Sequence, residues 1–215
     1  MKALLLVDIQ NDFLPGGALA VPKGDHLIPL IQEMVHYPFD LIIATKDWHP
    51  MKHESFVNNH LNKKKGDVIN LGGVQQILWP AHCVQGTWGA EFAPGWDTTQ
   101  VDKVIYKGEN VGIDSYSAFL DNAERISTGL EDYLKANSVK ELYIAGLATD
   151  YCVKYSVLNA IQFGFKPYVI ADACRGVNLN PSDSHAAFLL MQKAGAILLP
   201  FQDLKGILEE QNKAP

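Results

Sequence analysis

The sequence predicts an α/β fold in which a parallel sheet of six strands is covered by helices on both faces. Six short runs rich in valine, isoleucine and leucine are continuous rather than alternating in polarity, which is typical of strands covered on both faces. Helical patterns lie between several of these runs, and strands that alternate with helices favour a parallel sheet. The length of 215 residues indicates a single domain over residues 1–215.

The elements follow in a regular order. The expected strands are Ala3–Val7, Leu41–Ala44, Lys103–Tyr106, Glu141–Ala145, Pro167–Ala171 and Ala196–Leu199. Apolar residues at helical spacing predict helices near residues 27–35, 130–134, 153–161 and 186–191. Gly164 and Gly195 are expected to end the last two helices, and Ser182 is a candidate cap for the last one.

Residues 47–101 interrupt this order. They show little regular periodicity and are rich in glycine and proline. A long irregular insertion in a compact domain is usually functional or disordered, and the aromatic residues here argue against disorder. The segment also holds four of the seven histidines: His49, His53, His60 and His82. We therefore expect a functional insertion after the second strand.

Charge and cysteine content exclude several classes of protein. Lysine and arginine number 18 against 24 acidic residues, and the net charge of −6 argues against a partner that is a nucleic acid or an anionic membrane. The three cysteines form no CxxC pair, which favours a reducing compartment.

The apolar run at residues 3–7 is too short for a signal peptide, and no run is long enough to span a membrane. We expect a cytoplasmic protein.

Polar residues follow the first four strands at the point where each strand ends. Asp8 follows the first, Asp47 and His49 the second, Lys107 the third and Cys152 the fourth. Ligands of an open parallel sheet bind beyond the carboxyl ends of its strands. We therefore expect these side chains to meet at one edge, although the sequence does not give the order of the strands.

Cys152 lies in the stretch GLATDYCVKYS, residues 146–156. Thr149 or Asp150 can cap the helix that follows, and Cys152 then falls in its first turn, where the helix N-terminus favours a thiolate. Lys107 would act in the same direction, and Asp8 could take the thiol proton and return it to a leaving amine. A buried, unreactive cysteine is the alternative interpretation of this pattern.

The insertion carries candidate metal ligands. Asp47 and His49 are two residues apart at a strand end, so their side chains point the same way, and His53 and His82 follow in the chain. One carboxylate with two or three imidazoles suits Zn(II), Fe(II) or Mn(II). Unrelated loop histidines remain the alternative. The fold prediction thus includes a long metal-binding insertion after the second strand.

Three aromatic residues, Phe13, Trp79 and Tyr116, are candidates to line a pocket for a flat ring. Packing in the core is the simpler interpretation of each. Cys83 and Cys174 are expected to be buried packing residues.

Six stretches together resemble the nicotinamidase (pyrazinamidase) family within the isochorismatase-like cysteine hydrolases. They occur in the order typical of the family and cover nearly the whole chain. The stretches are LLLVDIQNDFLPGG, IIATKDWHPMKHESF, WPAHCVQGTWGAEF, YKGENVGIDSYSAF, IAGLATDYCVKYSVLNA and ADACRGV.

The resemblance implies a role for each matching residue. Cys152 corresponds to the nucleophile, Asp8 to the general base and Lys107 to the third member of a catalytic triad. A cis peptide between Leu147 and Ala148 would direct the N–H of Ala148, with that of Cys152, at the developing oxyanion. Phe13, Trp79 and Tyr116 match ring-binding positions. Asp47, His49 and His82 match metal ligands, and His53 matches a fourth ligand position with a direct or weaker contact.

The activity that the resemblance implies is hydrolysis of nicotinamide to nicotinate and ammonia, and also of pyrazinamide, through a cysteine thioester. One divalent metal ion, zinc or iron or else manganese, would anchor the ring nitrogen, and the product would enter NAD salvage. The protein would be a monomer or a homo-oligomer. The alternatives are a related amidase for carbamoyl or ureido substrates, a binding or metal-storage protein without catalysis, and a structural zinc module.

Overall fold

Six parallel strands form one sheet in the computed structural model of the chain, which describes residues 1–213. The strands lie in the order β5-β2-β1-β6-β7-β8. Each predicted strand overlaps one of them, so the predicted parallel six-stranded sheet is confirmed. Their bounds are Lys2–Val7 (β1), Leu41–Asp47 (β2), Lys103–Lys107 (β5), Glu141–Leu147 (β6), Lys166–Arg175 (β7) and Ile197–Leu199 (β8).

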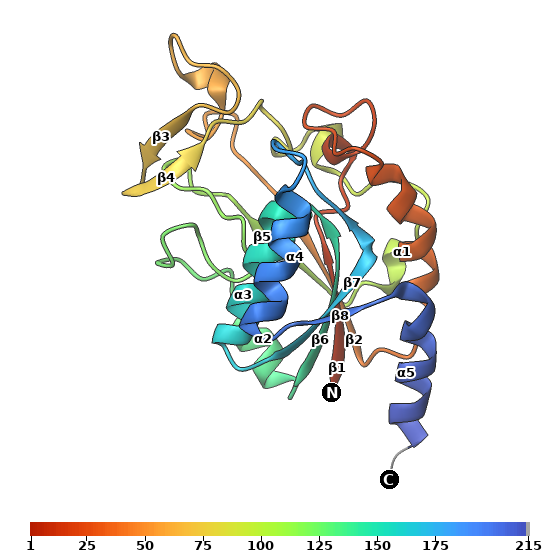
Figure 1. Cartoon of the computed structure of the whole chain (residues 1–215). Helices are drawn as coiled ribbons and strands as arrows, with labels where there is room; N and C mark the ends of the chain where they lie inside the picture. Colours follow the sequence, from red (N-terminus) through yellow and green to blue (C-terminus); the bar gives the residue numbers. More distant parts are fainter. Residues whose placement is uncertain (214–215) are drawn as a thin grey trace.

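Helices cover both faces of this sheet (Figure 1), as predicted. Leu4 and Leu6 of β1 point into a core shared with α1 and α5, while Leu5 and Val7 point into a core shared with α2, α3 and α4. Side chains alternate between the faces of a strand, so a strand buried on both faces is apolar throughout. The helices are Ile28–Met34 (α1), Leu130–Ala136 (α2), Lys154–Gln162 (α3), Asp183–Ala194 (α4) and Phe201–Lys213 (α5).

The register of the sheet places the ends of four strands together. Leu6 of β1 pairs with Ala44 of β2, and Val7 pairs with Gly146 of β6. On the other side of β2, Asp47 pairs directly with Lys107 of β5. The residues that follow β1, β2, β5 and β6 therefore meet at one edge of the sheet.

The segment between β2 and β5 contains short turns and one antiparallel hairpin, Val68–Leu71 (β3) with Val74–Ile77 (β4). Gly72 and Gly73 join the two strands with φ angles of 61° and 90°. Two consecutive positive φ values suit a tight hairpin turn, and glycine adopts them without strain. The hairpin projects from the sheet on the side away from the termini (Figure 1).

Helix ends agree only in part with the predicted signals. Gly195 follows α4 in the left-handed conformation, with a φ of 117°, as expected for a helix stop. Ser182 precedes α4, but its side chain makes no capping hydrogen bond. Helix α5 was not predicted. None of the helices in the described part of the chain is long and apolar enough to cross a membrane.

Candidate active site

Asp8, Lys107 and Cys152 meet at the carboxyl edge of the sheet, as the sequence predicted. The ammonium nitrogen of Lys107 lies 2.8 Å from Asp8 Oδ2 and 3.4 Å from Cys152 Sγ. All three side chains are buried. In the sheet, β1 lies between β6, which leads to Cys152, and β2, beyond which lies β5 with Lys107. Asp8 at the end of β1 therefore lies between the other two residues.

The Lys107 ammonium is held by several acceptors. It forms an ion pair with Asp47 Oδ1 as well as with Asp8, and it donates a hydrogen bond of 3.1 Å to the carbonyl of Ser115. Burial alone would lower the pKa of Lys107, but the carboxylates of Asp47 and Asp8 offset it and raise this pKa well above its usual value. Lys107 is therefore a permanent cation between two carboxylates.

Asp8 is held by a residue that the sequence analysis did not select. The hydroxyl of Thr45 on β2 donates to Asp8 Oδ1 at 2.5 Å and accepts the backbone N–H of Asp8 at 3.0 Å. Burial raises the pKa of Asp8 above its ordinary value, although Lys107 and the Thr45 hydroxyl oppose the shift. A carboxylate in this setting can exchange a proton with the neighbouring thiol more easily than an exposed aspartate can.

Cys152 lies in a π-helical turn, Thr149–Val153, that leads into α3. The predicted cap by Thr149 or Asp150 is wrong, because neither side chain makes a capping bond. The Asp150 carboxylate instead accepts the backbone N–H groups of Val177 and Asn178, at 2.9 and 2.7 Å. The cis peptide between Leu147 and Ala148, just before this turn, is present.

The charge state of Cys152 differs from the expectation. Burial raises the pKa of the Cys152 thiol well above its ordinary value, and the nearby Lys107 ammonium opposes this shift only in part. The resting side chain is therefore a thiol, and its activation requires a base to take the proton. Asp8 is the carboxylate placed to do so, because its side chain contacts both Lys107 and the thiol.

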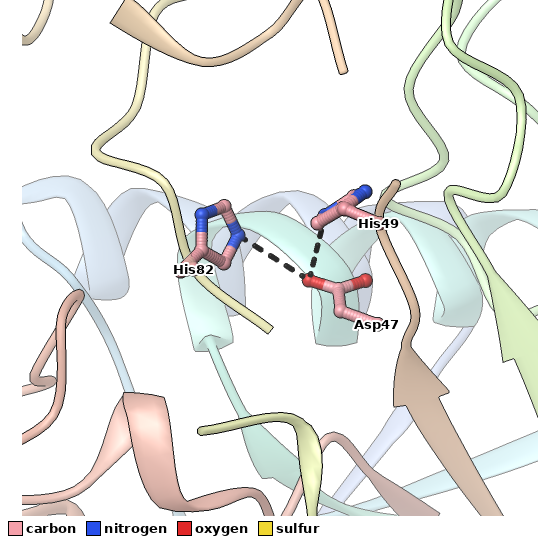
Figure 2. A group of neighbouring side chains, drawn as sticks. All are labelled: Asp47, His49 and His82. Atoms are coloured by element: carbon pink, nitrogen blue, oxygen red, sulfur yellow. Dashed lines mark ion pairs between the residues drawn. The ribbon is translucent and has the colours of Figure 1, made fainter. Parts of the chain in front are cut away.

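Asp47, His49 and His82 form a compact buried group (Figure 2). The Nε2 atoms of His49 and His82 each lie 3.6 Å from Asp47 Oδ2. One possible ligand atom from each residue lies within 4.8 Å of the others. Burial would raise the pKa of Asp47, but Lys107 and His49 hold it well below its usual range, so this carboxylate is ionised.

The remaining hydrogen bonds orient both imidazoles so that Nε2 of each faces Asp47. Nδ1 of His49 contacts the carbonyl of Gly108 at 2.8 Å, and Nδ1 of His82 contacts the carbonyl of Pro80 at 2.8 Å. A carbonyl only accepts, so each Nδ1 carries a proton and each Nε2 is the ring nitrogen that could bind a metal. The donor set fits a divalent transition metal such as zinc.

Gly108 is required beside this group. A Cβ at position 108 would lie 2.3 Å from Cε1 of His49, and the φ of Gly108 is +70°. Any other residue here would be strained and would collide with the imidazole. Gln10 supports the same group from the other side, since its amide bonds the backbone N–H and carbonyl of Asp47 at 2.9 and 2.8 Å.

His53 lies beside this group in a different arrangement. Its Nδ1 accepts the backbone N–H of Ser55 at 3.1 Å, and its Nε2 lies 3.3 Å from the carbonyl of Ile113. Burial lowers the pKa of His53 to about 4, so the ring is neutral. Its possible ligand atoms group with His49 and Asp114 rather than with Asp47 and His82. Direct ligation by His53 stays a prediction.

One pocket joins the reactive residues to the aromatic ones. Cys152, Asp47 and His82 line it together with the three predicted ring-binding residues, Phe13, Trp79 and Tyr116. Ala148, which the resemblance assigns to the oxyanion site, also lines it. The structure adds lining residues that the sequence analysis did not select: Leu19, Asp114, Tyr151 and Val177. The buried Asp114 follows Lys107 by seven positions, in a segment where no periodic pattern marks it.

Known proteins resemble the chain over nearly its whole length. The model of the isochorismatase domain family matches residues 2–203. The nicotinamidase of Escherichia coli K12 is 46% identical over 205 residues, which cover 94% of this chain and 96% of that protein.

Two solved structures extend this similarity to the fold. A nicotinamidase/pyrazinamidase of Acinetobacter baumanii has a TM-score of 0.91 and 42% identity, covering 94% of this chain and 97% of that one. A pyrazinamidase of Pyrococcus horikoshii, solved in complex with zinc, has a TM-score of 0.75 and 37% identity, covering 93% and 98%.

The doubly covered parallel sheet and the match over residues 2–203 define the class of the protein, and the chain belongs to the isochorismatase domain family. Cys83, Cys152 and Cys174 are all free thiols, so Cys152 is available for chemistry. Within the family, the chain belongs to the nicotinamidases, which makes it a hydrolase that acts on a carboxamide.

Proposed function

We propose that the chain hydrolyses nicotinamide to nicotinate and ammonia, and that it accepts pyrazinamide as well. The observation that carries the proposal is the shared pocket. The Cys152 thiol, two residues of the Asp47–His49–His82 group and the aromatic side chains all line one space. A flat heteroaromatic carboxamide is a ligand that would use all three features. The activities named for the similar proteins support this choice.

We propose that Asp47, His49 and His82 hold one divalent ion, with His53 as a fourth ligand. Zinc or iron fits this donor set, and manganese would be tolerated. When bound, the ion would supply positive charge that anchors and orients the ring nitrogen. The zinc in the similar pyrazinamidase and the orientation of the two imidazoles, each with Nδ1 on a backbone carbonyl, support this assignment.

The chemistry of the chain's own residues follows from their contacts. Asp8 takes the proton of the Cys152 thiol, and the sulfur attacks the carbonyl carbon of the carboxamide. The backbone N–H groups of Ala148 and Cys152 stabilise the oxyanion that forms on the carbonyl oxygen. Asp8 then donates its proton to the nitrogen as the C–N bond breaks, which releases ammonia and leaves a thioester.

The second half of the reaction reverses these roles. Asp8, now ionised, takes a proton from water, and the oxygen of that water attacks the thioester carbonyl. The C–S bond breaks, nicotinate leaves, and the sulfur recovers a proton through Asp8. Throughout the cycle the Lys107 ammonium holds the carboxylate and the sulfur together, since it contacts both.

The wider setting that we propose is a single hydrolase domain over residues 1–215, acting in the cytoplasm as a monomer or homo-oligomer. Nicotinate is a precursor from which pyridine nucleotides can be rebuilt, so the reaction would feed NAD salvage.

Ammonia release from purified protein tests the activity. The metal content is measured on the same preparation, and nicotinamide and pyrazinamide are compared with a ureido compound of similar size. We expect release from both heteroaromatic carboxamides and loss of release after chelation. No release with zinc, iron and manganese supplied in turn would contradict the proposal, and turnover of the ureido compound alone would favour a different amidase.

A further inference from the structure

Gln76 on β4 of the β3–β4 hairpin contacts two residues that line the substrate pocket. Gln76 is fully buried, whereas its neighbour Gln75 is exposed. Nε2 of Gln76 lies 2.9 Å from the hydroxyl of Tyr116 and 3.1 Å from Oδ2 of Asp114. Both of these residues line the pocket, so the hairpin contacts its wall directly.

The orientation of the Gln76 amide follows from its partners. Its Nε2 also lies 2.8 Å from the carbonyl of Ile77, and a carbonyl and a carboxylate can only accept. The end of the Gln76 amide that faces the Ile77 carbonyl and the Asp114 carboxylate is therefore the NH2 group. Oε1 of Gln76 accepts from the side chain of Asn122 at 3.0 Å, and Asn122 in turn accepts the backbone N–H of Tyr116 at 2.9 Å. Gln76, Asn122 and Tyr116 thus form a closed ring of hydrogen bonds.

The hydroxyl of Tyr116 faces two donors. Nε1 of Trp79 lies 3.1 Å from it, and Nε2 of Gln76 lies 2.9 Å from it. An indole N–H and an amide N–H only donate, so the hydroxyl oxygen is the acceptor in both contacts. It shares the two hydrogens of the Gln76 amide with the carbonyl of Ile77 and with Asp114 Oδ2. Among the hydrogen bonds of residues 1–213, none takes the hydroxyl hydrogen of Tyr116, which is therefore available to a ligand in the pocket.

We propose that Gln76 is a positioning residue for substrate specificity. It fixes the Tyr116 hydroxyl and the Asp114 carboxylate in the pocket wall, so that the Tyr116 O–H donates to the bound substrate. The inference rests on the proposed function in taking that substrate to be a heteroaromatic carboxamide. It gives the hairpin, which lies outside the catalytic group, a part in substrate binding.

Substitution at two adjacent positions of β4 tests the proposal. Gln76→Leu removes the amide at similar size, and Gln75→Leu makes the same change on the exposed face of the same strand. We expect KM for nicotinamide to rise about tenfold in Gln76→Leu, with kcat changed less than about threefold, because lost hydrogen bonds of this kind weaken binding by that order. Gln75→Leu should match the wild type in both constants.

A double substitution separates positioning from general destabilisation. Tyr116→Phe removes the hydroxyl, so Gln76→Leu added to Tyr116→Phe should raise KM by less than about twofold further. Independent, multiplying effects of the two substitutions would overturn the proposal. If Gln76→Leu does not fold, Gln76→Met removes the donor without a charge beside Asp114, and an unchanged KM in that variant would also overturn it.

A crystal structure of the folded Gln76 variant adds a readout that does not depend on turnover. The proposal requires the side chains of Tyr116 and Asp114 to shift from their wild-type positions, and it is wrong if both stay in place. A wild-type protein that releases no ammonia would contradict the proposed function alone, because this structural readout would still decide the role of Gln76.

Discussion

Asp47 and Lys107 are direct register partners on β2 and β5, and their side chains form a buried ion pair. The Lys107 ammonium also contacts Asp8. A single cation therefore joins Asp47, a member of the Asp47–His49–His82 group, to the Asp8 carboxylate beside Cys152. The two halves of the site are therefore coupled through one residue. We expect a substitution in either half to change the chemistry of the other.

Lys107→Met tests this coupling. The substitution leaves two buried carboxylates, Asp8 and Asp47, without their cation, and an uncompensated buried charge costs about 3–5 kcal/mol. We expect the free energy of unfolding to fall by that order at neutral pH, together with loss of turnover. Metal affinity should rise, because the ammonium no longer competes with a divalent ion for the Asp47 carboxylate. Denaturant unfolding and metal analysis measure these effects.

Lys103→Met is the matched control for this variant, since Lys103 is exposed on the same strand. It should leave stability, metal content and turnover close to those of the wild type. Wild-type metal affinity in Lys107→Met would show that the two halves of the site are independent.

Cys152→Ala removes the proposed nucleophile. Turnover of nicotinamide should fall by about 10⁴-fold or more, as is typical when a nucleophile is deleted. Folding and metal content should be unchanged, because Cys152 contributes no atom to the Asp47–His49–His82 group. Cys174→Ala, at another buried free cysteine, should keep its activity. Thioester trapping by mass spectrometry adds a direct check, and an active Cys152→Ala protein would exclude the covalent route.

Gly108→Ala should weaken metal binding without touching a ligand. The new Cβ would lie 2.3 Å from the His49 ring, so the imidazole must leave its present position beside Asp47. We expect metal affinity to fall by about 10- to 100-fold, as for other changes around metal-binding histidines. The measurement is competition with a chelator of known affinity.

Gly164→Ala separates this collision from backbone strain. Gly164 has a φ of +84°, close to the +70° of Gly108, but a Cβ there meets nothing within 4 Å. Both variants carry a similar conformational cost, and only Gly108→Ala should lose metal affinity. Equal affinity in the two would mean that the position of the His49 ring does not control binding.

Much of the fold could be predicted because burial on both faces makes strands apolar throughout. The sequence could not give the order of the strands, since pairing between β2 and β5 joins residues about 60 positions apart. Helix α5 was missed because Gly206 interrupts its interior, where glycine is unfavourable. The hairpin strands β3 and β4 have four residues each, too few for a clear period.

The site shows the same division. Asp8, Asp47, Lys107 and Cys152 could be selected because each follows an apolar strand. Gln76 and Asp114 could not, since their pairing spans 38 positions and neither follows a strand of the main sheet. The supposed cap at Asp150 failed for a related reason, because its carboxylate binds the backbone near residue 177 instead of its own helix.

The pH dependence of kcat/KM tests the role of Asp8 as the base. Only the ionised carboxylate can take the thiol proton, so activity is lost as the pH falls through the pKa of Asp8. Burial raises that pKa above the ordinary 3.8, so the acid limb of the profile should lie above pH 3.8. The Thr45 hydroxyl donates to the ionised carboxylate and opposes this shift.

Thr45→Val removes that donor at nearly constant shape, which should raise the pKa of Asp8 further and move the acid limb to higher pH. The exposed Thr99 provides the control, and Thr99→Val should leave the profile unchanged. Metal content is measured at each pH, so that loss of the ion is not mistaken for protonation of Asp8. An acid limb that stays in place in Thr45→Val, with the metal retained, would mean that another group limits the rate at low pH.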